Sequence, residues 1–529
     1  MFIDSLKETL NGDEFNVSIT ENGALGYATT GKNLLDLNFA VASLRKATKI
    51  DIYQRFLSAF GEDKSLALKW LFFARDVRGG LGERRLFRAI MEHLVACQPR
   101  EIEHLLPLIP EYGRWDDLIT LLSVGIPETN SEVVEIRKSI IQIIVKQFTS
   151  DSVNMLAGKP ISLLAKWLPS VNTSSRETVK LGRYIASKIF STSEHKESNR
   201  LYRIALSGLR NHIQLIERKM SAGEWNEIDY GKVPSRANII YKNAFQKHDG
   251  VRRQEFLDAL VKGETKINAG VLFPHDIVNK YSFMIRQYKH PTIDQTLEEL
   301  WKALPNTVEP NALTIVVADG SGSMTNVIGN TNIMALDVAN ALAIYFSERL
   351  SGEFKNNYIT FSNRPQLVDL GMCNTLLEKI QRAREFCEIC NTDIEKVFDL
   401  ILTTAKTNAM KQEEIPANVL VISDMEFDDA GTGTQLLNET TRKKLFQIIS
   451  EKWRDSGYKL PRLVFWNVNS RTGTIPVKEN DNGVALVSGF SPNVAKMVMS
   501  GQLDPFECLK ETLMSGRYAP IVTRDSLPD

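Results

Sequence analysis

The chain has 529 residues, of which 43% are hydrophobic and 24% charged, and its 64 basic side chains equal its 64 acidic ones in number. This length suits two or three globular domains, and the composition excludes a disordered or fibrous protein. No apolar stretch reaches the roughly 18 residues that a membrane helix needs, and the first residues lack the features of a signal peptide. Five cysteines, an odd number, argue against a disulfide framework. We therefore expect a cytoplasmic protein with no membrane partner.

The first 300 residues show the spacing of amphipathic helices. Apolar residues recur at helical spacing in residues 65–74, 85–94 and 131–148, and short segments with glycine or proline separate the helices. Residues 174–177 have the pattern of a capping box, which predicts a helix from there through residue 190. Successive helices with short connections predict an α-helical repeat domain, HEAT-like in kind, over residues 1–307.

Basic side chains outnumber acidic ones in residues 151–290, where an RNA-binding surface would be expected. Arg203 and Arg210 are seven positions apart, which places them on one face of a helix. Phosphate binding needs such clusters, and the nearby Tyr202, Tyr241 and Phe245 could stack on unpaired bases. The candidate RNA contacts are Lys180, Arg183, Arg200, Arg203, Arg210, Arg236, Lys242, Lys247, Arg252 and Arg253. The alternative is that the charges only solvate outer helix faces while the aromatic rings face the core.

A second basic cluster surrounds the glycines of residues 79–82. The arginines of residues 75–85 could bind phosphate through their guanidinium groups. They could equally pair with the acidic residues of the same segment.

After about residue 308, short β-branched runs alternate with helical patterns. The expected strands are residues 313–318, 358–361, 419–423, 463–467 and 484–488. The expected helices are residues 333–350, 393–407, 440–453 and 492–499. This alternation predicts a doubly wound, Rossmann-like α/β domain over residues 308–529, with a parallel sheet covered by helices on both faces. Ligands of such sheets bind at the carboxyl ends of the strands.

Oxygen-bearing side chains gather at those strand ends. Asp319, Ser321 and Ser323 follow the first strand, Thr392 precedes a helix, and Asp424 ends a later strand. Carboxylates and hydroxyls from separate loops are ligands that Mg²⁺ accepts, together with several waters. We therefore predict a site for Mg²⁺ or another divalent cation. The alternative for residues 319–322 alone is an ordinary turn.

The order of these segments, Asp-x-Ser-x-Ser, then Thr-Asp, then Ser-Asp, resembles the von Willebrand factor A domain over about residues 308–529. The resemblance implies a metal-ion-dependent adhesion site, in which an acidic group of a partner often completes the coordination. It also implies that Ser321, Ser323 and Thr392 bind the metal through their hydroxyls, while Asp319 and Asp424 act largely through bound waters.

Other segments resemble a second family, the one catalogued as domain of unknown function 2828. They are residues 72–87, 112–118, 166–170, 465–468 and 486–491, so this resemblance covers nearly the whole chain. A helical-repeat front joined to a von Willebrand A back is also similar to the Ro autoantigen and the TROVE proteins. That similarity of architecture implies binding of small structured RNAs or of the loose ends of misfolded RNAs.

Several catalytic and metal motifs are absent or incomplete. Cys387 and Cys390 have zinc-knuckle spacing without a second pair, no P-loop sequence occurs, and all seven histidines precede residue 300. The usual general base is thus missing near Ser321 and Ser323. We expect no catalytic residues. Glu426 is the nearest further carboxylate for a second metal.

Three functions follow from these patterns. The first is a non-enzymatic RNA-binding protein, whose basic helices hold RNA while the magnesium site recruits a partner or stabilises the assembly. The second is a metal-dependent protein interaction scaffold without RNA, which captures an acidic protein partner. The third is a metal-dependent phosphoesterase.

Overall fold

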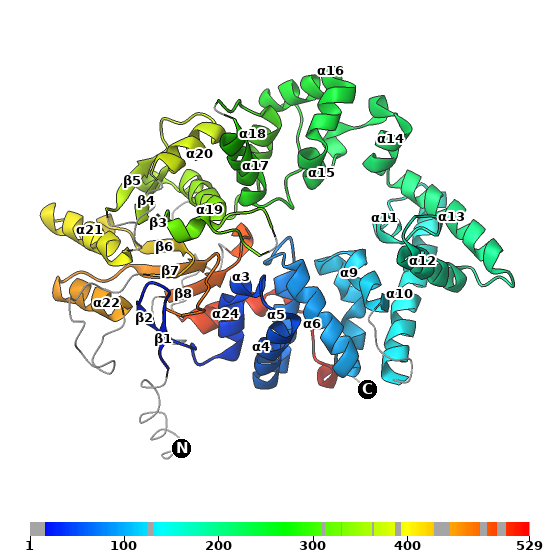
Figure 1. The fold of residues 1–529 in the computed structure, drawn as a ribbon, viewed down its shortest axis with the longest axis horizontal. Coiled ribbons are helices and arrows are strands. Elements are labelled where there is room, and N and C mark those ends of the chain that lie inside the picture. The colour runs from blue at the N-terminus through cyan, green and yellow to red at the C-terminus, as the bar shows by residue number, and fades with distance from the viewer. Residues whose placement is uncertain are drawn as a thin grey trace, which may run out of the picture. The chain divides into compact units, whose positions relative to one another are not determined.

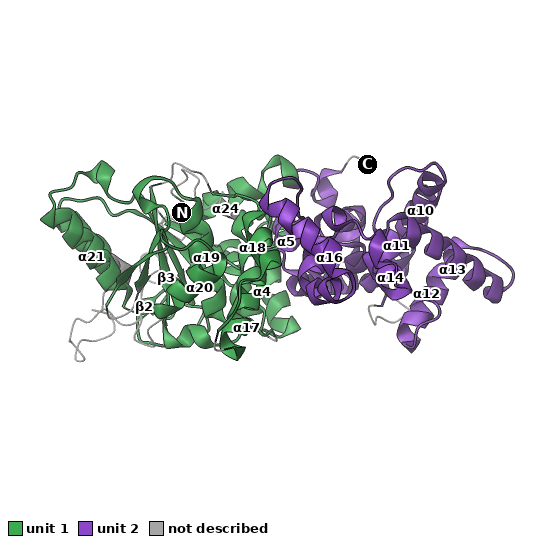
Figure 2. Ribbon diagram, turned by 90° about the horizontal axis from the view of Figure 1, so that it is seen from above, with its two compact units in different colours: residues 1–67, 79–81, 269–517 green, residues 68–78, 82–268, 518–529 purple. Residues whose placement is uncertain are grey.

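The computed structural model describes residues 16–123, 131–288, 290–308, 313–329, 331–361, 364–386, 393–427, 445–476, 484–494 and 504–527. The chain forms two compact units, each built from several segments (Figure 2). The first unit takes residues 1–67, 79–81 and 269–517, and the second takes residues 68–78, 82–268 and 518–529. The division at residue 307 that we expect from the sequence stays a prediction.

A six-stranded sheet forms the centre of the first unit (Figure 1). Its strands, in spatial order, are β5 (Gln366–Asp369), β4 (Asn357–Phe361), β3 (Thr314–Asp319), β6 (Asn418–Ser423), β7 (Arg462–Asn467) and β8 (Val484–Ser488). All neighbouring strands are parallel except β5, which pairs antiparallel with β4 at the edge. The expected α/β class is therefore confirmed, and β5 is a strand that the sequence did not predict.

The inner strands are apolar runs because both of their faces are covered. Every residue of β3 and β8 is buried, as are all but the first residues of β6 and β7. The helices of this part are α19 (Ala335–Arg349), α20 (Leu376–Glu385), α21 (Ile394–Thr407), α22 (Leu445–Asp455) and α24 (Pro505–Leu513). Three of them, α19, α21 and α24, pack against strands of the sheet. Of the expected helix 492–499, only residues 492–494 are described, and they form the 3-10 turn η9 (Pro492–Val494).

Segments from the first 67 residues and from residues 269–302 complete the first unit. They form the hairpin of β1 (Ser18–Ile19) and β2 (Leu25–Gly26) and the helices α2 (Asn33–Phe39), α3 (Val41–Leu44), α4 (Lys49–Glu62), α17 (Pro274–Gln287) and α18 (Gln295–Lys302). The buried Glu298 of α18 ties this part to the sheet region, because its carboxylate accepts hydrogen bonds from the backbone N–H of Leu376 (2.7 Å) and the hydroxyl of Tyr281 (2.7 Å). It thereby caps the start of α20.

The second unit is mostly helical. It holds most of α5 (Lys64–Arg75), and α6 (Arg84–Cys97), α7 (Pro99–Ile102), α8 (Ile109–Tyr112), α9 (Trp115–Thr120), α10 (Ser131–Leu156), α11 (Leu164–Trp167), α12 (Arg176–Ile189), α13 (His195–His212), α14 (Ile216–Ala222), α15 (Ser235–Ile240) and α16 (Lys242–Val261). The predicted helix is α12, but it starts one residue later than the capping pattern of residues 174–177 implies: the N-cap is Ser175, whose hydroxyl accepts a hydrogen bond from the N–H of Thr178 (3.3 Å). Among the helices that the structure describes, none has the length and apolar composition to cross a membrane.

Candidate metal centre

The sheet brings the two predicted aspartates together. Asp319 is the last residue of β3, and Asp424 directly follows β6. These strands are parallel neighbours, with Ala318 opposite Ile422, so both carboxylates lie at the same carboxyl edge. After β3 the chain turns into the 3-10 helix η5 (Gly322–Thr325), which carries Ser323 and follows directly on Ser321.

The carboxylate of Asp319 is buried and held by two hydrogen bonds. The backbone N–H of Ser321 donates to Oδ1 (2.9 Å), and the hydroxyl of Ser423 donates to Oδ2 (2.7 Å). Burial and the neighbouring charge of Asp424 raise the pKa of Asp319 to about 7. The protein therefore brings two carboxylates together without fully compensating their charge.

Asp424 is wholly buried, and part of its carboxylate lacks a hydrogen bond. The N–H of Glu426 donates to Oδ1 (3.3 Å), whereas Oδ2 has no hydrogen-bond partner among the residues that the structure describes. Burial raises the pKa of Asp424, while the nearby Ser323 hydroxyl and the positive charge of Arg471 partly offset this rise in the pKa. A buried carboxylate oxygen without a hydrogen bond is costly unless a cation approaches it.

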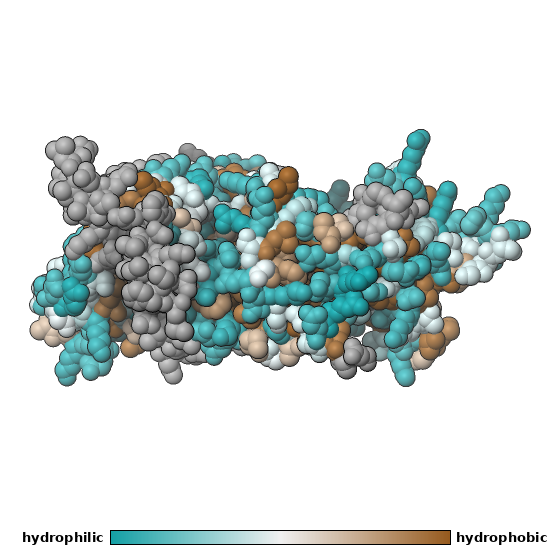
Figure 3. All heavy atoms as spheres, turned by 90° about the horizontal axis from the view of Figure 1, so that it is seen from below, coloured by the Kyte–Doolittle hydropathy of each residue, from teal (hydrophilic) through white to brown (hydrophobic). Residues whose placement is uncertain are grey.

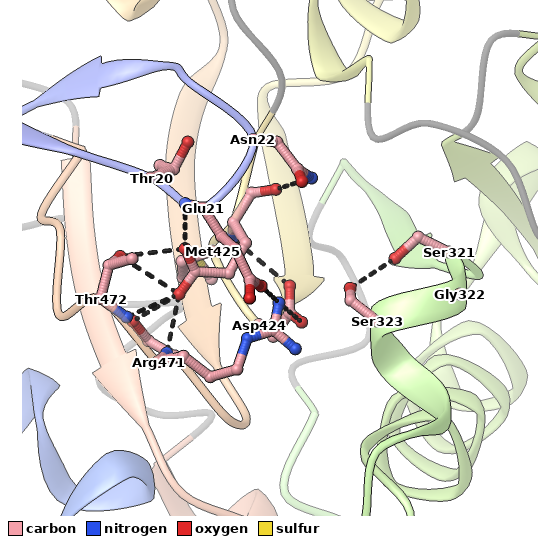
Figure 4. Close-up of polar contacts among 12 residues, drawn as sticks. Thr20, Glu21, Asn22, Ser321, Gly322, Ser323, Asp424, Met425, Arg471 and Thr472 are labelled. Carbon is pink, nitrogen blue, oxygen red and sulfur yellow. Dashed lines mark hydrogen bonds and ion pairs between the residues drawn. The ribbon is translucent and has the colours of Figure 1, made fainter.

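Two serine hydroxyls complete this group of oxygens. Ser321 Oγ and Ser323 Oγ are 3.0 Å apart, and Figure 4 shows Ser323 on the side of the turn that faces Asp424. Two carboxylates and two hydroxyls are hard oxygen donors of the kind that Mg²⁺ accepts. With the hydrogen-bond-free Oδ2 of Asp424, these residues fit a divalent cation. Thr392 lies outside the described residues, so its role as a ligand stays a prediction, as do the positions of Cys387 and Cys390.

Glu426, the candidate for a second metal, has a structural task. Its buried carboxylate accepts hydrogen bonds from the backbone N–H groups of Glu21 (2.9 Å), Arg471 (2.7 Å) and Thr472 (2.9 Å), and from the Thr472 hydroxyl (2.9 Å). These bonds satisfy its oxygens and fasten the turn of the β1–β2 hairpin to the loop after β7 (Figure 4). Glu426 is therefore a poor candidate for a second metal ligand.

Sequence patterns did not point to Arg471, which lies in the loop after β7. Its Nη2 atom lies 3.3 Å from Oδ2 of Asp424, and the same atom forms an ion pair with Glu21. Neither contact is aligned as a hydrogen bond. The available signal was the position of Arg471 just after an expected strand, 463–467, whose carboxyl end meets the same edge of the sheet.

Four of the ten candidate RNA contacts take part in contacts inside the second unit. The guanidinium of Arg210 donates to the carbonyls of Ala165 (2.8 Å) and Leu168 (2.7 Å) and to Ser170 Oγ (2.9 Å). The guanidinium of Arg252 donates to the Ile228 carbonyl (2.9 Å) and forms an ion pair with Asp249 (2.8 Å). The guanidinium of Arg200 forms an ion pair with Glu197 (2.7 Å).

The fourth, Arg253, is only 1% exposed and lies over the ring of Tyr230, with 5.0 Å between the guanidinium carbon and the ring centroid. The rings of Tyr202 and Phe245 are fully buried, so they face the core, as the alternative predicts, and offer no stacking surface. Tyr241 is partly buried and packs against the same cluster as Phe245. Arg210 and Arg253 therefore hold parts of the fold together, whereas Arg200 and Arg252 form internal contacts while staying partly open to solvent.

Other candidate contacts are exposed. Lys180 and Arg183 line a groove of about 700 Å³ together with Arg176 of the same helix, α12. Arg203 lines a second groove of about 460 Å³ on α13, beside Arg200 and Arg218. Lys247 is exposed on α16, whereas Arg236 and Lys242 each interact with other residues of the protein. Hydrophilic side chains dominate the face drawn in Figure 3, with hydrophobic ones scattered among them.

Part of the second basic cluster forms ion pairs inside the protein. Arg75 is buried, and its Nε and Nη2 atoms lie 2.8 and 2.7 Å from Oδ2 of Asp117. Arg88 pairs with the other oxygen of the same carboxylate (2.6 Å). Gly113 packs so closely that an added Cβ would lie 2.6 Å from the Asp117 carboxylate. This part of the cluster stabilises the fold.

Comparison with known proteins matches two families without a described function. The model of domain of unknown function DUF2828 matches residues 20–146 and 138–312. The model of domain of unknown function DUF7788 matches residues 313–515, in place of the von Willebrand factor A domain that we expected there from the sequence. A similar protein is Uncharacterized protein L728 of Acanthamoeba polyphaga mimivirus, which is 30% identical over 528 residues, covering 94% of this chain and 87% of the viral protein.

Proposed function

The chain belongs to the family described as domain of unknown function DUF2828, and we propose that it is a non-enzymatic binding protein that uses a divalent cation to capture an acidic group of a partner. The observation that carries this proposal is the pair of buried carboxylates, Asp319 and Asp424, with one oxygen of Asp424 left without a hydrogen bond within the described part of the chain.

The electrostatics of the pair favour a cation. Burial removes both carboxylates from water, and burial together with the negative charge of Asp424 explains the raised pKa of Asp319. Mg²⁺ would offset both charges, with Asp319, Ser321, Ser323 and Asp424 holding it directly or through waters. Because hydroxyls are neutral ligands, the ion would keep more of its attraction for an acidic group from outside.

The architecture supports the same proposal. A mostly parallel sheet with an antiparallel edge strand, and with this Asp-Ser turn at its carboxyl edge, is what a von Willebrand factor A domain would present. Packed helix pairs such as α12 and α13 support a HEAT-like repeat in the second unit. A cytoplasmic location belongs to the same proposal.

Capture of a carboxylate tests the function. A short fluorescent polyglutamate peptide should bind to the purified chain in Mg²⁺ and not in excess EDTA, as read by fluorescence anisotropy. Asp319→Ala should weaken binding at least about tenfold, since it removes one of the two carboxylates. Asp369→Ala, at the exposed end of β5, is the matched control and should bind like the wild type. Equal binding in EDTA would contradict the proposal.

RNA binding is a second candidate, which the α12 groove favours. Arg176, Lys180 and Arg183 are spaced by four and three residues, so they share one face of the helix. Within the described ranges, the side chains of these three residues form no ion pair or hydrogen bond. Phosphate groups could neutralise this face without breaking any internal contact.

Salt dependence tests this candidate. Affinity for single-stranded RNA should fall steeply with salt, and Lys180→Gln with Arg183→Gln should reduce the slope by roughly 0.7 for each phosphate that the variant no longer neutralises. Lys262→Gln, an exposed lysine just after α16, is the control and should leave the slope unchanged. An RNA affinity that does not change with salt concentration, or that the paired substitution does not change, would contradict RNA binding by these helices.

A further inference from the structure

Arg471 lies between two carboxylates of different exposure. Its Nη2 atom forms an ion pair with Glu21, whose side chain is 58% exposed, and lies 3.3 Å from Oδ2 of Asp424, whose side chain is fully buried. The arginine side chain itself is 23% exposed. Because neither contact is an aligned hydrogen bond, Arg471 has two competing ion contacts and is fixed to neither by geometry.

The backbone around this pair is fixed. Glu426 accepts hydrogen bonds from the N–H groups of both Glu21 (2.9 Å) and Arg471 (2.7 Å), so one buried carboxylate positions both partners. The hairpin turn is fastened further by Asn22, whose Nδ2 donates to the Glu426 carbonyl (2.8 Å), and by Thr20, whose hydroxyl donates to the Phe427 carbonyl (2.6 Å). Motion of the guanidinium therefore needs only side-chain rotation.

Asp424 Oδ2 is the atom that this arginine and a divalent cation would share. It is the oxygen without a hydrogen bond in the described structure, and Arg471 supplies the nearby positive charge. A cation at Asp319 and Asp424 would repel the guanidinium, because two like charges in a buried site interact strongly. Glu21 offers Arg471 a place that is close and more exposed.

We propose that Arg471 is an internal competitor of the divalent cation: in the metal-free protein its guanidinium contacts both Asp424 and Glu21, and when the cation binds it gives up the contact with Asp424 and keeps the contact with Glu21. This inference rests on the proposed metal site. Glu21, on a hairpin 403 positions before Asp424 (424 − 21), thereby sets the affinity of that site. The β1–β2 hairpin thereby regulates the affinity of the metal site. If the hairpin moves away, Arg471 loses Glu21, pairs with Asp424 alone and lowers the affinity for the cation.

Mn²⁺ titration of the full-length chain, followed by the loss of the free-ion signal in electron paramagnetic resonance, tests the competition. Arg471→Gln should raise Mn²⁺ affinity about tenfold, because it removes a positive charge beside the ion. Glu21→Gln should lower the affinity several-fold, and in the double variant the Glu21 effect should disappear, since the arginine with which Glu21 pairs is absent. Arg471→Lys keeps the charge and should stay near the wild type.

Two matched controls separate these local effects from total charge. Arg454→Gln and Glu385→Gln remove exposed charges of the same sign elsewhere in the first unit and should leave Mn²⁺ affinity unchanged. If Mn²⁺ binds and Asp424→Asn abolishes binding, but Arg471→Gln leaves the affinity equal or lower, the competition is wrong while the metal site stands. If no variant binds Mn²⁺, the proposed metal site and this inference fail together.

Discussion

The hydroxyl of Ser423 donates a 2.7 Å hydrogen bond to Oδ2 of Asp319 from the neighbouring strand. This bond crosses from the end of β6 to the end of β3 and is buried at both ends. The bond comes from the strand that precedes Asp424 and holds the carboxylate of Asp319 in place, so the register of the sheet sets the geometry of the proposed metal site.

Loss of this bond should destabilise the protein. Ser423→Ala leaves an oxygen of a buried carboxylate with one donor fewer, and we expect a loss of about 1 to 3 kcal/mol in the free energy of unfolding of the metal-free chain. Urea unfolding followed by circular dichroism measures it. Ser58→Ala, an exposed serine of α4, is the control and should change the free energy by less than about 0.5 kcal/mol.

The raised pKa of Asp319 predicts how stability depends on pH. Its pKa is about 7 in the folded chain and 3.8 as the reference value, so the folded state binds more protons between these values. This contribution to stability is therefore complete below the lower value and is lost as the pH rises toward about 7. Urea unfolding in EDTA should show this decline, and Asp319→Asn should reduce it, with the remainder due to the raised pKa of Asp424. A wild-type stability that rises over the same range and matches that of the variant would contradict the assignment.

Glu298 should be a strong stabilising residue. Glu298→Ala removes the acceptor for the N–H of Leu376 and the hydroxyl of Tyr281, and both groups lie in the interior. We expect a loss of about 2 to 4 kcal/mol in the free energy of unfolding, because the N–H groups of Leu376 and Leu377 lose their acceptor and the Tyr281 hydroxyl is left to donate only to the Asp294 carbonyl. Glu353→Ala, on an exposed turn before β4, should have little effect in the same measurement.

The basic residues of the second unit should separate into two groups. Arg210→Gln breaks hydrogen bonds to three groups of the α11 region and should lower the melting temperature by several degrees. Lys180→Gln removes a side chain that pairs with no other in the described structure and should leave the melting temperature unchanged. Differential scanning fluorimetry distinguishes them, and an equal effect of both substitutions would contradict the division.

Local pattern was enough to predict most of the sheet and its two aspartates. β3 and β6 are mostly apolar runs that end at Asp319 and just before Asp424. The same sequence pattern therefore predicted each strand and the aspartate at its end. β5 was not predicted because Gln366–Asp369 is a four-residue edge strand with only two apolar residues, Leu367 and Val368, which is too short to give a clear strand pattern. The side chain of Arg210 could not be told from that of Lys180, because both occur in basic helical segments and only the packing decides which is engaged.

The contacts of Arg471 could not be predicted from sequence for a different reason. Glu21 and Glu426 are 405 positions apart, and their hydrogen bond depends on how the N-terminal hairpin packs against the sheet. No periodicity or motif encodes such a contact. The resemblance to the von Willebrand factor A domain implies which residues would hold a metal. It does not predict an arginine, such as Arg471, beside them.

Isothermal titration of the full-length chain with Mg²⁺, at about pH 8 and so above the pKa of Asp319, tests the central claim most directly. We predict saturable binding of one ion to the wild type and to Asp369→Asn, and its loss in both Asp319→Asn and Asp424→Asn. Absence of Mg²⁺ binding to the wild type, or equal binding by all four proteins, would contradict a metal centre at the carboxyl edge of β3 and β6.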